Sequence, residues 1–421
     1  MKHFEYVVIG AGPAGGAAAI ELARDSTSPT VALIGGERHA PYERPPLSKA
    51  TLKEQGGVIA PQHLYGDVPD LSRAGVTPFI PDLVVGIHRE NHCVTLASGE
   101  QLSYGKLLFA TGSSPRRLSV PGASLPRIHY LRTYDDAVAL SAEIRAQHKI
   151  VVIGGGFIGL EVAATARSAG CEVVVIEAGP RLLARAVPDA ISSAVLRKFE
   201  GEQVKVVLGE GVQAIFGSEC AKGVELTNGA RIYADCIVVG IGAAPNSALA
   251  ESCGLDVRDG ILTDADGRTS DSCCFAAGDV AHRTQGLATH PKYARRLEAW
   301  QPAIEQGVAV ARVMLGVPSV PLATPWIWSD QFDWNIQIAG HGDLADTVIY
   351  RQGTSDDSTS VFQLCQGRLI GMVTLNEPRT MSLGRRALER GAIVDPAQLA
   401  NPEISIKDAL LGVRSPGTES G

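Results

Sequence analysis

Two glycine-rich runs contain residues whose types and spacing could do chemistry. Residues 10–15 read Gly-Ala-Gly-Pro-Ala-Gly, and residues 154–159 read Gly-Gly-Gly-Phe-Ile-Gly. In a GxGxxG pattern the glycines let the backbone approach a pyrophosphate at the N-terminus of the following helix. The pattern alone is weak evidence, so the elements on either side of it decide its meaning.

Both runs have the required neighbours. A buried-strand pattern at 4–9 precedes the first run, a helical pattern follows it, and Glu37 comes after the next strand. Strands at 149–153 and 172–176 surround the second run in the same way, and Glu177 ends the latter. An acid at this position accepts hydrogen bonds from ribose hydroxyls. We therefore predict two dinucleotide sites in one chain; for Glu37 the alternative is a solvated loop acid.

Further strands repeat the arrangement and set the domain boundaries. Buried strands at 107–112 and 236–242 each end at glycine behind their own fingerprint, which indicates a duplication. A third such strand ends in Ala-Gly-Asp at Asp279, downstream of the second fingerprint, so the first domain must be discontinuous. We predict that four parts follow from this order: a first dinucleotide-binding domain at 1–115 and 250–320, a second at 116–249, an α+β domain at 321–412, and a disordered tail at 413–421.

Residues 41–49, Pro-Tyr-Glu-Arg-Pro-Pro-Leu-Ser-Lys, form a rigid segment behind the first fingerprint. The consecutive prolines hold Arg44 in an extended conformation. The pattern at 47–53 then predicts a helix with Lys49 in its first turn. A cation there opposes the helix dipole and needs a compensating partner. A broken local rule of this kind indicates function. The alternative is a solvated lysine on a proline-rich loop.

The composition is that of an ordinary globular protein. The chain has 421 residues, 45% hydrophobic and 20% charged, with a formal net charge of −7, which argues against a nucleic-acid binder. It shows no secretory signal, no membrane-spanning apolar run, no metal-ligand spacing and no Cys-x-x-Cys, so we expect a cytoplasmic protein with reduced cysteines. For the vicinal Cys273 and Cys274 we expect core packing.

Residues 41–49 together with the two fingerprints resemble the FAD-dependent ferredoxin reductases of bacterial oxygenase systems, such as the putidaredoxin, rhodocoxin and biphenyl-dioxygenase ferredoxin reductases. The resemblance covers residues 4–412. It implies an α/β fold with two Rossmann-like, glutathione-reductase-like dinucleotide-binding domains plus a small C-terminal α+β domain. It also implies an NADH:ferredoxin oxidoreductase, in which FAD takes a hydride from NADH and passes single electrons to a [2Fe–2S] ferredoxin. That ferredoxin would feed a Rieske oxygenase or a cytochrome P450.

The resemblance assigns residues to both cofactors, position by position. It implies FAD contacts at Gly10, Gly12, Pro13, Ala14, Gly15, Glu37, Arg44, Lys49, Val84, Ala110, Thr111, Gly112, Arg132, Gly278, Asp279 and Trp300. It implies nicotinamide-site residues at Gly154, Gly156, Phe157, Ile158, Gly159, Glu161, Glu177 and Gly242. Because the carboxylate of Glu177 repels a 2′-phosphate, we expect NADH over NADPH, a preference that the nearby Arg181 tempers without reversing. Pro302 replaces the family's usual asparagine, which puts details near the flavin rim in doubt.

Four residues are the catalytic candidates. Phe157 matches an aromatic that covers the flavin and swings aside for nicotinamide, the alternative being a packing residue at the helix start. Glu161 matches the acid that pairs with the lysine of residues 41–49, here Lys49. Their role would be electrostatic and orienting, since hydride transfer from NADH releases no proton that must be abstracted. Trp328 matches a tryptophan near the flavin edge and is a candidate for electron exit, the alternative being a core aromatic.

The electron acceptor is expected to be external. No redox Cys-x4-Cys follows the first fingerprint, so electrons would leave the flavin directly for a transiently bound ferredoxin. An acidic reductase that meets an acidic ferredoxin needs a local cationic patch. Candidates for this patch are Lys292, Arg295, Arg296, Arg379, Arg385 and Arg386. Two alternatives remain open: a rubredoxin reductase or diaphorase, and a binding or signalling flavoprotein like apoptosis-inducing factor.

Overall fold

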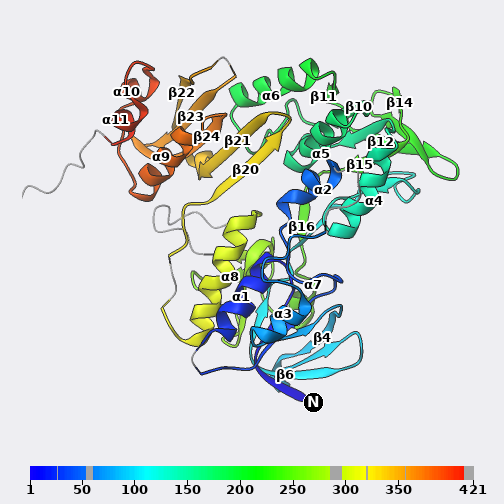
Figure 1. Ribbon diagram of the computed structural model, residues 1–421, viewed down its shortest axis with the longest axis vertical. Coiled ribbons are helices and arrows are strands. Elements are labelled where there is room, and N and C mark those ends of the chain that lie inside the picture. The colour runs from blue at the N-terminus through cyan, green and yellow to red at the C-terminus, as the bar shows by residue number, and fades with distance from the viewer. Residues whose placement is uncertain (26, 54–59, 285–295, 319–320, 356, 412–421) are drawn as a thin grey trace, which may run out of the picture. The chain divides into compact units, whose positions relative to one another are not determined.

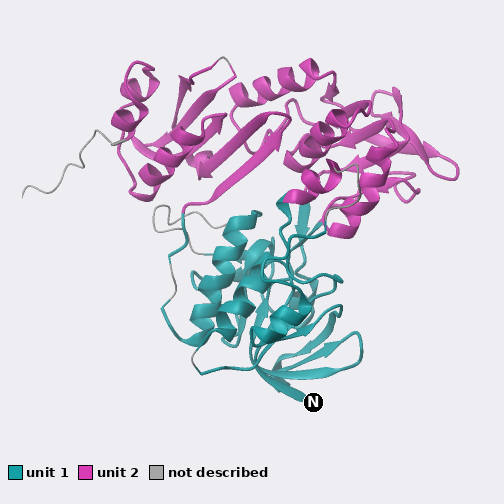
Figure 2. Ribbon diagram, viewed as in Figure 1, with its two compact units in different colours: residues 1–45, 60–114, 243–323 teal, residues 46–59, 115–242, 324–421 magenta. Residues whose placement is uncertain are grey.

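The computed structural model describes residues 1–25, 27–53, 60–284, 296–318, 321–355 and 357–411 (Figure 1). The chain forms two compact units, each assembled from three segments (Figure 2). Unit 1 consists of residues 1–45, 60–114 and 243–323. Unit 2 consists of residues 46–59, 115–242 and 324–421. Among the described residues, no helix is both long and apolar enough to cross a bilayer.

Unit 1 is built on a seven-stranded sheet with the order β3-β2-β1-β6-β5-β4, and β18 pairs with β6. The parallel part is made by β1 (Lys2–Ile9), β2 (Val31–Ile34), β3 (Val76–Phe79), β6 (Gln101–Phe109) and β18 (Cys274–Ala276). The strands β4 (Val84–His88) and β5 (Cys93–Leu96) add an antiparallel hairpin. Two short pairs complete the strands of this unit: β7 (Ser113–Pro115) with β16 (Ala243–Pro245), and β17 (Ile261–Thr263) with β19 (Ala281–Arg283).

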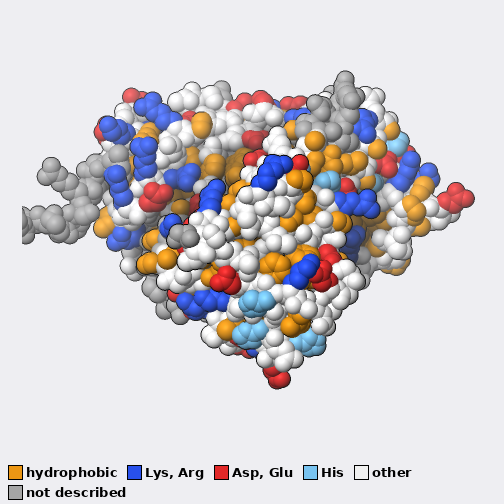
Figure 3. All heavy atoms as spheres, turned by 60° about the horizontal axis from the view of Figure 1, so that its bottom comes forward, with side chains coloured by type: hydrophobic (Ala, Val, Ile, Leu, Met, Phe, Trp, Pro, Cys, Tyr) orange, Lys and Arg blue, Asp and Glu red, His pale blue; other side chains and the backbone are white. Residues whose placement is uncertain are grey.

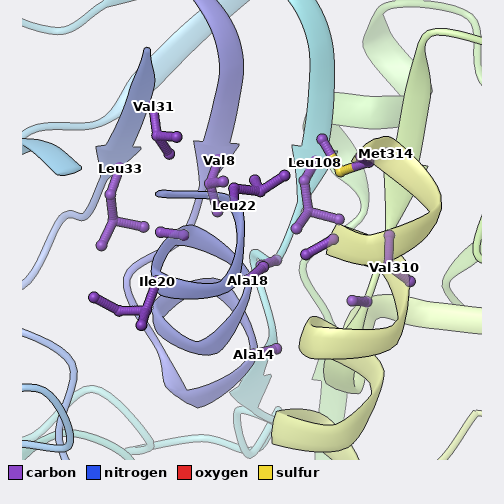
Figure 4. Packing of buried hydrophobic residues seen from close by; sticks show 14 of the residues in the cluster. Val8, Ala14, Ala18, Ile20, Leu22, Val31, Leu33, Leu108, Val310 and Met314 are labelled. Atoms are coloured by element: carbon purple, nitrogen blue, oxygen red, sulfur yellow. The ribbon is translucent and has the colours of Figure 1, made fainter. Parts of the chain in front are cut away.

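The core of unit 1 lies between this sheet and two helices that are far apart in the sequence. Helix α1 (Pro13–Ala23) packs between the strands and α8 (Trp300–Leu315), as Figure 4 shows. The contact is close because most of the buried residues of α1 are alanine and glycine. A Cβ placed on Gly307 of α8 would lie 2.2 Å from the carbonyl oxygen of Ala14. Small residues therefore set the distance between the two helices. The remaining helices of unit 1 are α3 (Val68–Arg73) and α7 (Ala248–Ser252).

Unit 2 contains a second parallel sheet with the order β11-β10-β9-β15-β8. Its strands are β8 (Ile128–His129), β9 (Ile150–Ile153), β10 (Val173–Glu177), β11 (Lys205–Leu208) and β15 (Cys236–Val239). Helices α4 (Tyr134–Arg145), α5 (Phe157–Ser168) and α6 (Asp189–Gly201) accompany it. A separate antiparallel sheet is formed by β12 (Val212–Gly217), β13 (Ala221–Leu226) and β14 (Arg231–Tyr233).

The C-terminal part of unit 2 is an antiparallel sheet with helices. The strand order is β20-β21-β24-β23-β22. The bounds are β20 (Trp326–Gln331), β21 (Trp334–Gly340), β22 (Thr347–Gln352), β23 (Thr359–Cys365) and β24 (Arg368–Leu375). Helix α9 (Pro378–Glu389) packs on β21 and β24, and α10 (Pro396–Ala400) and α11 (Ile406–Leu411) follow. The predicted class, two Rossmann-like sheets plus a small α+β part, is confirmed.

Two local expectations need correction or comment. Helical structure begins earlier than the predicted position 47: Pro45–Ser48 is a 3-10 turn, and Lys49 lies between it and α2 (Ala50–Lys53). Proline suits a first helical turn, where its missing N–H is not needed. Cys274 is buried in β18, and this burial raises the pKa of its thiol to about 12, as expected for a neutral packing residue. The predicted tail at 413–421 lies outside the described residues.

The contact between α1 and α8 generates a stability prediction. We expect Gly307→Ala to destabilise the protein by about 1–3 kcal/mol, because the added methyl meets backbone rather than a movable side chain. The control is Gly201→Ala on α6, where an added Cβ meets nothing within 4 Å. Alanine there should be neutral or stabilising by a few tenths of a kcal/mol. Urea unfolding of both variants measures the difference; equal stabilities would contradict the close packing.

Candidate functional site

The first fingerprint joins β1 to α1, and its glycines are required by close backbone contacts. Gly10 has a φ of +111°, and a Cβ placed on it would lie 2.1 Å from the carbonyl oxygen of Ala110. A Cβ on Gly15 would lie 1.8 Å from the carbonyl oxygen of Gly10. By contrast, a Cβ on Gly12 would have the Arg44 guanidinium at 3.9 Å as its neighbour. The backbone at Gly12 is thus open to an approaching phosphate, with a cation beside it.

Arg44 and Glu37 form an ion pair beside this fingerprint. Arg44 Nη2 lies 2.6 Å from Glu37 Oε1, and the Tyr42 hydroxyl donates to Glu37 Oε2. The guanidinium also lies over the Tyr42 ring, 5.2 Å from its centroid. Burial by itself would lower the pKa of Arg44, but the charges of Glu37, Tyr42 and Asp279 raise it overall. Arg44 therefore stays cationic while largely buried.

Asp279 lies next to the N-terminus of α1. It belongs to the short turn η3 (Gly278–Val280), where Gly278 has a φ of +76° and donates its N–H to Gln306 Oε1 at 3.0 Å. A Cβ on Gly278 would lie 2.9 Å from Cβ of Ala14. The Ser113 hydroxyl donates to Asp279 Oδ2 at 2.8 Å. The carboxylate is thus held beside the fingerprint.

The end of β6 is fixed by a residue that sequence reasoning missed. The backbone carbonyl of Asn246 accepts a hydrogen bond from Thr111 Oγ1 at 2.8 Å. The side-chain Nδ2 of Asn246 donates to the Thr111 backbone carbonyl at 2.9 Å. Its own N–H donates to the Gly112 carbonyl at 2.9 Å. No sequence signal links residues this far apart. The other predicted FAD contacts of unit 1, Val84 and Trp300, begin β4 and α8 and are half-buried.

The second fingerprint, between β9 and α5, repeats the geometry of the first. Gly154 has a φ of +112°, and its Cβ would lie 2.4 Å from the carbonyl oxygen of Gly240. A Cβ on Gly159 would lie 2.2 Å from the carbonyl oxygen of Gly154, whereas one on Gly156 would meet nothing within 4 Å. Phe157 and Ile158 start α5, with Phe157 half-buried and Ile158 exposed. The close backbone contacts of the first and last glycines and the open middle glycine are thus the same in both fingerprints.

Glu177 at the end of β10 is held by backbone donors. Its Oε2 accepts from Gly155 N–H and its Oε1 accepts from Gly179 N–H, both at 2.7 Å. These bonds fix the carboxylate beside the second fingerprint.

The nearby Arg181 is engaged elsewhere. It donates from Nη1 to the Val187 carbonyl and from Nη2 to the Ala184 carbonyl, each at 2.9 Å. Its Nε lies 2.9 Å from a carboxylate oxygen of Asp189. Each nitrogen of its guanidinium thus has a partner other than Glu177.

Two arginines that sequence reasoning missed lie near Gly242. With a φ of +105°, Gly242 would carry a Cβ 3.6 Å from Arg185 Nη2 and 3.8 Å from Arg116 Cδ. The Arg116 N–H also donates to the Gly242 carbonyl at 2.9 Å. Both arginines are exposed. Their positions in the sequence, outside any motif, gave no signal.

Lys49 forms the predicted ion pair with Glu161. Lys49 Nζ lies 2.9 Å from Glu161 Oε2, and the Glu161 side chain is only 4% exposed. Two serines that were not predicted also donate to this carboxylate: Ser48 to Oε2, and Ser329 of β20 to Oε1 at 2.7 Å. The buried charge is therefore neutralised and hydrogen-bonded. Arg132, another predicted FAD contact, also belongs to unit 2 and lies just before α4. Its backbone N–H donates to the Asp136 carboxylate.

Trp328 lies in a stacked aromatic pair on β20. Its ring is 4.9 Å from that of Trp326, with 24° between the planes, and the Arg385 guanidinium lies 4.8 Å from the centroid of Trp326. Trp326 also donates from Nε1 to Gln337 Oε1 at 3.1 Å. Trp328 itself is half-buried.

The predicted cationic patch is only partly supported. The prediction for Arg296 is wrong. Its side chain is 7% exposed, pairs with Asp259 and Glu298, and holds the loop around η3. Lys292 and Arg295 lie outside the described residues. Arg379 and Arg386 are exposed on α9, and Arg385 is half-buried over Trp326. Sequence reasoning missed Arg390, which is exposed at the end of the same helix.

Comparison with known proteins identifies the family. Residues 4–307 match the Pyridine nucleotide-disulphide oxidoreductase family, and residues 326–410 match the Reductase C-terminal family. The chain belongs to the pyridine nucleotide-disulphide oxidoreductase family and carries the reductase C-terminal domain. Members of this family use FAD and NAD(H).

Individual relatives are ferredoxin reductases. The chain is 37% identical to the anthranilate 1,2-dioxygenase system ferredoxin–NAD(+) reductase component of Burkholderia cepacia, over 97% of this chain and 100% of that one. The ferredoxin reductase for the CYP199A2 system of Rhodopseudomonas palustris superposes with a TM-score of 0.91 at 36% identity, covering 97% and 100%. The reductase–putidaredoxin complex gives a TM-score of 0.92 at 29% identity, covering 98% and 99%. The predicted resemblance is confirmed.

The residues present fit two bound dinucleotides. Each fingerprint is open at its middle glycine, where a pyrophosphate must approach the helix N-terminus, and closed at the other two. In unit 1, Arg44 supplies a positive charge for phosphate groups, and Asp279 supplies an acceptor for hydroxyl groups. In unit 2, Glu177 is fixed with its carboxylate beside the glycines.

The ion pair between Lys49 and Glu161 generates a prediction with an internal control. Lys49→Met should destabilise the protein by about 3–5 kcal/mol, because it leaves a buried carboxylate without a counter-charge. Adding Glu161→Gln removes that charge, so the double variant should be more stable than Lys49→Met alone. Urea unfolding at neutral pH measures all three proteins. If the double variant were the least stable, charge neutralisation would not be what Lys49 provides.

Proposed function

We propose that this protein is an NADH-dependent ferredoxin reductase of an oxygenase system. The observation that carries the proposal is the Lys49–Glu161 pair in a chain that has two open fingerprints and no Cys-x4-Cys behind the first. The relatives named ferredoxin reductase over almost the whole chain support it. Its partner is a ferredoxin, for which we propose the [2Fe–2S] type. Its eight free cysteines suit a reducing compartment such as the cytoplasm.

We assign FAD to the first fingerprint and the nicotinamide to the second. The FAD-binding domain would comprise residues 1–115 and 250–320, the NAD-binding domain 116–249 and the reductase C-terminal domain 321–412. In the first, Gly12 and Arg44 would hold the pyrophosphate, Glu37 the ribose, and Asp279 hydroxyls of the ribityl chain. The opening at Gly12 and the position of Asp279 beside α1 support this assignment.

The preferred electron donor is NADH. The carboxylate of Glu177 would accept hydrogen bonds from two ribose hydroxyls and repel a 2′-phosphate. The guanidinium of Arg181 is engaged with two carbonyls and with Asp189, which would weaken its attraction for that phosphate. These contacts of Arg181 support the proposed preference for NADH.

The residues around Glu161 would position the reactants. Bound FAD supplies the chemistry, which is hydride acceptance from a reduced nicotinamide and release of electrons one at a time. Lys49 and Glu161 form a neutral, preorganised pair that needs no reorganisation during transfer. Phe157, at the start of α5, would cover the flavin and swing aside for the nicotinamide. No residue has to act as a general base, because no proton is abstracted.

The ferredoxin would dock on α9 beside the tryptophans. Arg379 and Arg386 are seven residues apart and therefore lie on one face of the helix, which Arg390 extends by another turn. Lys and Arg side chains gather at the left of Figure 3, on the side where α9 to α11 lie in Figure 1. Arg385 connects this face to Trp326, which stacks on Trp328. A cationic surface next to an aromatic pair suits an acidic electron carrier.

Anaerobic mixing tests the proposed function. The purified flavoprotein is mixed with NADH or NADPH, and flavin absorbance is followed while [2Fe–2S] ferredoxins or rubredoxin are added. We expect rapid bleaching by NADH and rapid reoxidation by a [2Fe–2S] ferredoxin. Faster reoxidation by rubredoxin would indicate a rubredoxin reductase. A long-lived charge-transfer band that no carrier discharges would overturn the reductase function.

The role of Glu177 yields a prediction on donor choice. Glu177→Gln keeps the side-chain shape but removes the charge, so the ratio of kcat/KM for NADH over NADPH should fall about tenfold or more. Glu172→Gln is the control, because Glu172 lies just before the same strand and is exposed. Steady-state kinetics with ferricyanide as acceptor measure both ratios. An unchanged ratio in Glu177→Gln would assign the preference to another residue.

The docking surface yields a second prediction. Arg379→Glu combined with Arg386→Glu should raise the KM for ferredoxin about tenfold at low salt, and added salt should reduce the difference. Reduction of ferricyanide by NADH should not change. The control is Arg145→Glu combined with Arg197→Glu, which changes the net charge equally at exposed positions of α4 and α6. If the control raises the KM as much, net charge and not α9 governs docking.

A further inference from the structure

The carboxylate of Glu161 receives a hydrogen bond from a part of the chain that is remote from both fingerprints. Its Oε2 is satisfied by Lys49 and Ser48, which lie one after the other in sequence. Its Oε1 accepts from the Ser329 hydroxyl at 2.7 Å. Ser329 belongs to β20, in the reductase C-terminal domain, and is fully buried. The C-terminal domain thus contributes directly to the surroundings of Glu161.

A neighbouring side chain fixes the direction of this hydrogen bond. Gln331 Nε2 lies 3.1 Å from Ser329 Oγ, and both residues point to the same face of β20. The single hydroxyl proton goes to the charged carboxylate, since such charge-assisted bonds are the stronger ones. The amide of Gln331 then donates to the hydroxyl oxygen. Gln331 is 1% exposed, so water does not compete for these groups.

The strand that carries Ser329 is itself anchored on the nicotinamide-binding part of unit 2. At its turn, Lys198 of α6 lies 2.6 Å from Asp333 Oδ1, and its ammonium lies 5.6 Å from the Trp334 ring centroid. The rings of Phe199 and Phe332 pack edge to face at 5.1 Å between centroids. Helix α5, which carries Glu161, also packs on β20. The serine is therefore presented to Glu161 by a strand held at two places.

We propose that Ser329, oriented by Gln331, is a positioning residue for Glu161 in reduction of the flavin by NADH. This inference rests on the proposed function. Ser329 fixes the plane and rotamer of the carboxylate, so that Glu161 holds Lys49 in one geometry. The C-terminal domain then serves the reductive step as well as electron exit, because Ser329 follows Trp328 directly on β20.

The first test is the rate of flavin reduction. Stopped-flow mixing of Ser329→Ala with saturating NADH should show a reduction rate about tenfold lower, as expected for loss of a hydrogen bond to a charged group. The affinity for NADH should stay within about twofold, since the serine acts through Glu161 and not on the ligand. Ser360→Ala is the control, a buried serine on β23 of the same sheet, and it should leave the rate unchanged.

A double-mutant cycle separates positioning from general damage. With Glu161→Gln present, Ser329→Ala should cost little further rate, and its effect on the urea unfolding midpoint should shrink in the same background. Gln331→Met, of similar volume, should also slow flavin reduction, but by less than Ser329→Ala. It provides the test if Ser329→Ala does not fold. Equal losses in both backgrounds, or equal behaviour of Ser329→Ala and Ser360→Ala, would overturn the proposal. The unfolding cycle needs no NADH, so its result stands even if the proposed function fails.

Discussion

A buried carboxylate constrains much of unit 2. Glu161 lies on helix α5, among alanine, valine and leucine residues of the same helix. An ionised group in such surroundings is tolerated only with a counter-charge and hydrogen-bond donors. The chain meets this requirement with residues from two other places in the sequence: Lys49 and Ser48 from the proline-rich segment, and Ser329 from the C-terminal domain. The need to satisfy one carboxylate therefore brings three segments to one point.

The duplicated fingerprint imposes a different constraint. In both copies the first and last glycines contact backbone so closely that no side chain fits, while the middle glycine stays open. The copies differ in what surrounds the opening. The first has the cation Arg44, and the second has the fixed carboxylate of Glu177 with its arginine bound elsewhere. One backbone geometry thus occurs twice, with different charges placed around it.

Local patterns allowed much of this fold to be predicted. Both fingerprints, their strands and the acids after them follow from short-range rules, and the structure places Gly10 and Gly154 in the same left-handed conformation. The pairing of Lys49 with Glu161 was predicted only through a family resemblance. Ser329 was missed, because a serine in an alternating strand gives no signal until its partner, 168 residues away, is known. Arg296 was misjudged, because a charged side chain in sequence looks exposed whether or not acids bury it.

The packing of α1 against α8 has a consequence for how the protein is made. Helix α1 is complete at Ala23, but its packing partner does not begin until Trp300, and β18, which completes the sheet, comes after Thr269. During synthesis α1 therefore lacks this partner while about 280 further residues are translated. The sheet of β8 to β11 and β15 is contiguous in sequence and can close earlier. The face of α1 that packs on α8 is thus made early and covered late.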